Sequence, residues 1–210
     1  MKTDAEFWNR AAEKYAAKPV SNVAAFERKK EITRALLAPD QTLFEHGCGT
    51  GSLALELAPH VAHVHAMDIS AEMIRIARGK AEAQDVDNVT FHVGTLEGGG
   101  VPLAPGEADG VAAFNILHLV EDRAGALRAL FGLLAPGGFF VSSTACLGET
   151  WMPLPALIGV LRLVGRAPRV WSFDKATLRR EMEEAGFVDV TEHDVGADAM
   201  TAFVVAAKPG

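Results

Sequence analysis

The sequence predicts a doubly wound α/β fold, and three observations support that prediction. From residue 42 onward, short apolar runs alternate with helical patterns. Single helices separate successive strands, so the connections must cross over and the strands must run parallel, with helices on both faces. Apolar residues make up 49% of the 210 positions, which is enough for one sizeable core.

The elements follow in chain order. Two helical patterns come first, at 4–18 and 22–38, and we expect them to form an N-terminal cap over residues 1–38. The alternation then predicts strands at 42–46, 62–69, 88–93, 109–117 and 137–144. Helices are expected between them at 51–60, 70–84 and 122–134.

The C-terminal part continues the same domain. A helix over 174–186 begins at Asp174 and ends at Gly186. Two strands follow at 187–195 and 200–208, and the short loop between them favours antiparallel pairing. We therefore expect one domain over residues 1–210.

Composition narrows the class of protein. The net charge of −7 argues against a nucleic-acid partner, because such a partner needs clustered Lys and Arg. Cys48 and Cys146 fit no metal spacing and are expected to be reduced thiols. The N-terminus lacks the apolar core of a signal peptide, and no apolar run is long enough to span a membrane. We expect a soluble cytoplasmic protein.

The stretch "FEHGCGTG" carries the main functional signal. Its glycines, Gly47, Gly49 and Gly51, follow a strand, but Ser52 stands where a dinucleotide site needs its third glycine. An ionised Glu45 at the strand end would repel a pyrophosphate. The same carboxylate favours a ligand that brings positive charge, such as S-adenosylmethionine with its ammonium and sulfonium groups.

"FEHGCGTG" followed by "AMDIS" resembles the cofactor-binding core of class I S-adenosylmethionine-dependent methyltransferases. "NILHLVED", "LLAPGGFFVSST" and "LRREMEEAGF" resemble the small-molecule branch, which includes quinone-biosynthesis C-methyltransferases. The resemblance implies a Rossmann-like, mostly parallel sheet of seven strands, in the order 3-2-1-4-5-7-6, with the last strand antiparallel.

The resemblance also implies roles for residues. Glu45 would face the ammonium group, Asp68 would accept hydrogen bonds from the ribose hydroxyls, and Tyr15 would close over the cofactor. The full set implied to bind the cofactor is Tyr15, Glu45, His46, Gly47, Cys48, Gly49, Gly51, Asp68, Ile69, Met73, Gly94, Thr95, Leu96, Asn115 and Ile116. Many members of the family carry Gly-Asp after the third strand, where this sequence has Gly94-Thr95. Thr95 could therefore be only a turn residue. Core packing explains Tyr15 equally well, and Asp68 could be a helix N-terminal acid.

His118 is the candidate acid–base group, because imidazole titrates near neutral pH; the alternative is that it only packs. No Cys or carboxylate completes a ligand set for His60, His63 and His65, so we expect no metal site. Residues 145–171 mix apolar anchors with Arg162, Arg166 and Arg169. They are predicted to be a lid over an apolar or aromatic substrate, or else a packing helix or a homodimer surface.

The sequence therefore predicts in-line methyl transfer from S-adenosylmethionine to a small molecule, leaving S-adenosylhomocysteine. Carbon, oxygen and nitrogen stay open as the acceptor atom. Two alternatives belong to other classes of function: an NAD-type oxidoreductase, and a catalytically silent module that binds S-adenosylmethionine.

Overall fold

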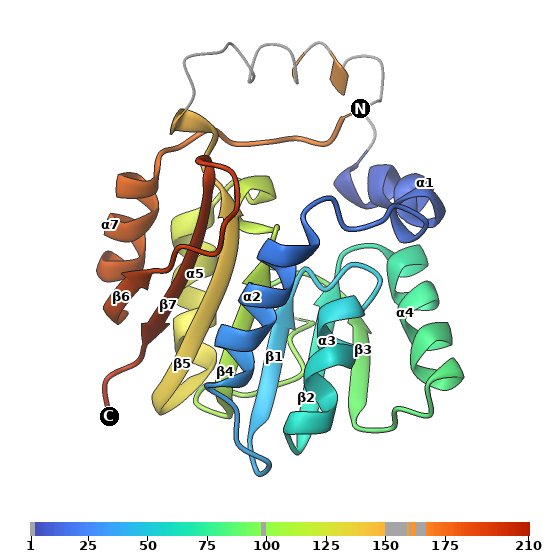
Figure 1. Cartoon of the computed structure of the whole chain (residues 1–210), viewed down its shortest axis with the longest axis horizontal. Helices are drawn as coiled ribbons and strands as arrows, with labels where there is room; N and C mark the ends of the chain where they lie inside the picture. The colour runs from blue at the N-terminus through green and yellow to red at the C-terminus, as the bar shows by residue number, and fades with distance from the viewer. Residues whose placement is uncertain (1–2, 98–99, 150–158, 160, 163–166) are drawn as a thin grey trace.

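The computed structural model describes residues 3–97, 100–149, 159, 161–162 and 167–210 (Figure 1). Within these ranges, seven strands form one sheet in the order β3-β2-β1-β4-β5-β7-β6. The strands are β1 (Thr42–His46), β2 (His63–Asp68), β3 (Val89–Val93), β4 (Ala108–Phe114), β5 (Leu134–Ala145), β6 (Val188–Glu192) and β7 (Thr201–Ala207). Strands β1 to β5 pair in parallel, and β7 runs antiparallel to both β5 and β6. The predicted order and the reversed last strand are confirmed.

Helices cover both faces of the sheet. They are α1 (Asp4–Ala16), α2 (Val23–Arg34), α3 (Ser52–Leu57), α4 (Ala71–Ala83), α5 (Arg123–Leu133) and α7 (Lys175–Ala185). One core lies between the sheet and the helices α5 and α7, to which Leu127, Leu130 and Met182 contribute. A second core lies on the opposite face, where α3 and α4 contribute Leu53 and Ile74.

Helix boundaries follow local chemistry. Ser70 and Asp174 cap α4 and α7 by accepting hydrogen bonds from the backbone N–H groups of Met73 and Thr177. Gly186 ends α7 with a φ of 108°. The helix expected over 51–60 stops at Leu57 and tightens into a 3₁₀ turn, η1 (Ala58–His60), that contains a proline.

Strand β5 begins earlier than expected. Its first residue, Leu134, pairs with Ala108, and the register then shifts before Phe139 pairs with Gly110. The "APGG" segment is therefore an irregularity within the strand rather than a turn before it.

Helix α2 is fixed to the domain by its lysines. The half-buried Lys29 donates from Nζ to Oγ of Ser143 in β5, over 2.8 Å. The buried Lys30 forms ion pairs with Glu27 at 2.9 Å and Glu56 at 3.2 Å. The N-terminal segment thus rests directly on the sheet and on α3.

Two expectations concern parts that the structure covers only partly. Most of the predicted lid, including Trp151, Leu154 and Arg166, lies outside the described residues. No helix among the described residues has the length and apolar character to cross a bilayer.

Candidate active site

A cavity of about 870 Å³ opens at the carboxyl ends of β1, β2 and β4. Open α/β sheets bind their ligands at this edge. Most of the predicted site residues line the cavity: Tyr15, His46, Gly47, Gly49, Asp68, Ile69, Met73, Gly94, Thr95, Leu96, Asn115, Ile116 and His118. The fold therefore gathers residues that are spread over about half of the chain.

The turn after β1 requires glycine. Gly47 has a φ of 73°, and a Cβ there would lie 2.5 Å from Cγ1 of Ile116. The N–H groups of Gly47 and Cys48 both donate to the carbonyl of Met67, at 2.8 and 3.0 Å. The turn is thus tied to β2 and leaves the backbone open to a close-lying ligand.

Asp68 ends β2 and lines the cavity. Its carboxylate accepts the backbone N–H of Gly49 on one oxygen and that of Ser70 on the other, both at 2.9 Å. A carboxylate offers about four acceptor positions, so both oxygens can still accept a hydroxyl. Burial raises the pKa of Asp68, and the two N–H donors oppose that shift.

Glu45 lies beneath the turn instead of on the cavity wall, with only 4% of its surface exposed. Burial and then the nearby Asp68 raise its pKa to about 8, while the backbone amide of Ala54 acts in the opposite direction. Its Oε2 has no hydrogen-bond partner among the described residues. The sequence argument assumed an ionised group, whereas burial favours the protonated form of this carboxyl at pH 7.

Two other predicted residues also lie outside the cavity lining. The buried side chain of Cys48 belongs to the core under α3 and α4. At Gly51, a Cβ would lie 2.8 Å from the ring of Phe91 and 2.9 Å from Ala77. Gly51 therefore allows close packing below the turn, and only the backbone of these residues can support a ligand.

The end of β4 carries an unusual backbone conformation. Asn115 has a φ of 56°, which is uncommon outside glycine. Its N–H donates to the carbonyl of Ser143 at 2.7 Å, so the chain turns sharply between β4 and the short helix η2 (Leu117–Leu119). This turn brings Asn115, Ile116 and His118 to the cavity.

Burial lowers the pKa of His118 to about 4, so the imidazole is neutral at physiological pH. Its Nδ1 is buried and has no partner in the described chain. The carbonyl of His118 accepts the backbone N–H of Trp171 at 2.8 Å, which fixes the C-terminal end of the predicted lid against η2. His118 is thus placed to contact a ligand but is a weak base.

Helix α1 closes one side of the cavity with Trp8 and Tyr15, whose rings meet edge to face with centroids 6.2 Å apart. The side chain of Tyr15 is 47% exposed; burial, and then the charges of Asp68 and Glu45, raise its pKa. A Cβ on Gly49 would lie 3.6 Å from the Tyr15 ring. Tyr15 therefore stands over the glycine turn.

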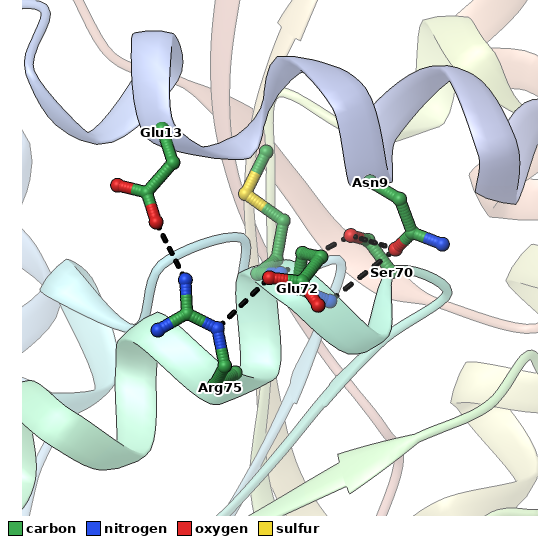
Figure 2. Close-up of polar contacts among 6 residues, drawn as sticks. Asn9, Glu13, Ser70, Glu72 and Arg75 are labelled. Atoms are coloured by element: carbon green, nitrogen blue, oxygen red, sulfur yellow. Dashed lines mark hydrogen bonds and ion pairs between the residues drawn. The ribbon is translucent and has the colours of Figure 1, made fainter.

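Polar contacts hold α1 on the first turn of α4 (Figure 2). Oδ1 of Asn9 accepts from Oγ of Ser70 at 2.7 Å and from the N–H of Glu72 at 3.2 Å. Arg75 joins Glu72 at 2.8 Å and Glu13 at 2.5 Å. Since Ser70 also donates its N–H to Asp68, α1 is connected to the predicted ribose site through one residue.

Sequence reasoning missed Asn9 and Lys80. Lys80 of α4 lines the cavity and donates to Oγ1 of Thr50 at 2.9 Å and to Oγ of Ser52 at 3.1 Å. Burial lowers its pKa. The hydroxyls of Thr50 in the glycine turn and of Ser52 at the start of α3 thus hold a cation at the cavity. The sequence contains no sign of this contact, because Lys80 lies ten positions after the capping Ser70 and belongs to no motif.

The histidines of β2 and β3 form a separate group. Nδ1 of His65 lies 3.3 Å from Nε2 of His92, and Nε2 of His63 lies 2.8 Å from Oγ1 of Thr90. Burial is the first cause that lowers the pKa values of His65 and His92. The described residues contain no cluster of three or more side chains that could hold a metal ion.

Comparison with known proteins adds independent findings. The family model for a methyltransferase domain matches residues 44–138. A ubiquinone biosynthesis O-methyltransferase of Serratia proteamaculans is 30% identical over 175 residues, which cover 83% of this chain and 70% of that protein. The corresponding enzyme of Methylocella silvestris is 34% identical over 131 residues, 60% of this chain and 48% of that protein.

A solved structure agrees at the level of the fold. Phosphoethanolamine N-methyltransferase 2 of Haemonchus contortus, crystallised with S-adenosyl-L-methionine, aligns with a TM-score of 0.77 at 14% identity. The alignment covers all of this chain and 61% of that one. Together with the strand order and the glycine turn, these likenesses establish that the chain belongs to the class I S-adenosylmethionine-dependent methyltransferases.

Proposed function

We propose that the protein transfers the methyl group of S-adenosylmethionine to a small-molecule acceptor. The proposal rests on one observation. The glycine turn and the Asp68 carboxylate lie together in one cavity, and Glu45 is buried beneath them. Two acids and an open backbone suit a cofactor with an ammonium group, a ribose and no phosphate.

The residues present fit that cofactor. Asp68 retains acceptor capacity for hydroxyls, Gly47 and Gly49 expose backbone, and Ile69 and Met73 offer apolar surface for a purine. The unpartnered Oε2 of Glu45 is a second acceptor below the turn. A positive group near it would favour the ionised carboxylate.

When bound, S-adenosylmethionine supplies a methyl group that its sulfonium already activates. The chain's contribution is then to align the acceptor and to exclude water, and such positioning is worth about 7–11 kcal/mol in favourable cases. Tyr15 and Trp8 cover one side, while Asn115, Ile116 and His118 border the space left for the acceptor. No strong base is needed, in keeping with the low pKa of His118.

The O-methyltransferase names of the relatives favour oxygen as the acceptor atom. The chain spans about half of the second relative, so the acceptor is proposed for this domain alone. Cys48 is a buried free thiol, which supports a reducing, cytoplasmic location. The homodimer proposed for residues 145–171 stays a prediction.

Two measurements test the function. Calorimetric titration should give binding of S-adenosylhomocysteine and none of NAD. Incubation with methyl-labelled S-adenosylmethionine and the small-molecule fraction of a cell extract should label a product. Binding of NAD in its place would support the oxidoreductase, and cofactor binding without any product would support the silent module.

A further inference from the structure

The cavity has a second polar wall that the cofactor residues do not use. It consists of His118 on η2 and of Arg169 and Trp171, which belong to the described C-terminal end of the predicted lid. The hydrogen bond from the N–H of Trp171 to the carbonyl of His118 joins the two segments. We refer to these three side chains as the donor wall.

Each member of the donor wall has a buried polar atom without a partner in the described chain: Nδ1 of His118, Nε of Arg169 and Nε1 of Trp171. Nε of Arg and Nε1 of Trp can only donate hydrogen bonds. A buried donor without an acceptor costs about 1–3 kcal/mol. Three such atoms on one wall of a cavity indicate a place for a bound acceptor.

Arg169 is the positively charged member of the wall. Its Nη1 forms an ion pair at 2.9 Å with Glu121, which is largely exposed and also lines the cavity, and this pair orients the guanidinium. A guanidinium carries five N–H donors, so Arg169 can pair with Glu121 and still donate to a second group. The neighbours Leu119, Pro168 and Val170 also line the cavity and give apolar surface beside the donors.

We propose that the donor wall binds a carboxylate, carried on an aromatic or apolar body, and so selects the acceptor substrate. This proposal rests on the methyl-transfer function and deepens it by naming a substrate class. Nε of Arg169 and Nε1 of Trp171 can only donate hydrogen bonds. The neutral imidazole of His118 supplies a third donor when Nδ1 carries the proton. Small side-chain adjustments of the kind common on binding bring the donors to the ligand.

The test uses matched aromatic probes on the full chain saturated with S-adenosylhomocysteine. We expect 4-hydroxybenzoate to bind at least tenfold more tightly than its methyl ester in calorimetric titration, and 4-hydroxybenzylamine not to bind. Trp171→Phe keeps the ring and removes the N–H, and Arg169→Lys keeps the charge and removes Nε. Each variant should weaken benzoate binding about tenfold, the effect of one hydrogen bond, and leave the affinity for S-adenosylhomocysteine unchanged.

Arg179→Lys, on the exposed face of α7, is the matched control and should bind the benzoate like the unchanged protein. The proposal is overturned if the acid binds no better than the amine, if no probe binds, or if both variants bind the acid normally. If S-adenosylhomocysteine itself fails to bind, the methyl-transfer function fails. In that case, the binding of 4-hydroxybenzoate and of 4-hydroxybenzylamine to the protein without S-adenosylhomocysteine still tests the donor wall.

Discussion

The carboxylate of Asp68 accepts the backbone N–H of Gly49 at 2.9 Å and so joins the end of β2 to the turn that follows β1. The same side chain holds Ser70, which caps α4 and contacts α1. One residue therefore positions three elements around the cavity.

Replacing Asp68 should weaken cofactor binding strongly. Hydrogen bonds to a charged acceptor contribute about 1.5–3 kcal/mol, so Asp68→Ala should reduce the affinity for S-adenosylhomocysteine by about 10- to 100-fold. Titration calorimetry measures this change. Asp87→Ala, on an exposed turn, is the control and should bind normally. An unchanged affinity in Asp68→Ala would remove Asp68 from the site.

Cofactor binding should release a proton near pH 7. The pKa of Glu45 is raised to about 8, and a bound ammonium group would lower it. Calorimetric titration in phosphate and in Tris, buffers of different ionisation enthalpy, reports the number of protons released. Glu45→Gln cannot release this proton. Equal enthalpies in the two buffers for the unchanged protein would contradict the assignment.

The same group predicts how the stability of the unliganded protein depends on pH. A carboxyl whose folded pKa lies above its unfolded value stabilises the fold at low pH, and this stabilisation is lost as pH rises from about 4.5 through 8. Glu45→Gln should therefore be less pH-sensitive over this window. Urea unfolding gives the free energy of unfolding of the unchanged protein and of Glu45→Gln at pH 6 and at pH 8.5. If this free energy changes between the two pH values by the same amount in both proteins, Glu45 does not cause the pH dependence.

His118→Ala should slow methyl transfer by about tenfold, because the residue is expected to contribute one hydrogen bond and not acid–base catalysis. The affinity for S-adenosylhomocysteine should be unchanged. Because the pKa of His118 is lowered to about 4, the pH–rate profile should show no inflection near 6.5 from this residue. Transfer of labelled methyl groups to an extract measures the rate. A rate equal to that of the unchanged protein would end the candidacy of His118.

Loosening α1 should open the cavity. Asn9→Ala removes the acceptor for Ser70 and for the N–H of Glu72, at a cost of about 1 kcal/mol in unfolding free energy. We expect faster hydrogen exchange in α1 and several-fold weaker binding of S-adenosylhomocysteine. Asn9→Asp keeps an acceptor oxygen and should restore both.

Glu13→Gln provides the control for α1, because it breaks only the exposed ion pair with Arg75. Such pairs contribute little, so exchange and binding should stay close to those of the unchanged protein. If Asn9→Ala and Glu13→Gln behave alike, the contacts at the first turn of α4 do not hold the helix.

The alternation of elements in the sequence predicted the parallel strands, and the resemblance to the methyltransferase family supplied their order in the sheet. Two short motifs in the sequence also pointed to Asp68 and the glycine turn, and the structure places both at one cavity. The sequence could not give the protonation of Glu45, which depends on how α3 and the turn bury the carboxyl. Nor could it pair Asn9 with Ser70, because such contacts arise only when α1 packs on α4.

The bond from Lys29 to Ser143 joins residues 114 positions apart. During synthesis, α2 leaves the ribosome long before β5, so Lys30 can pair with Glu56 of α3 while Lys29 still lacks Ser143. The contact of α2 with the sheet therefore forms later than its contact with α3, because the longer loop closes only after the strands between have emerged.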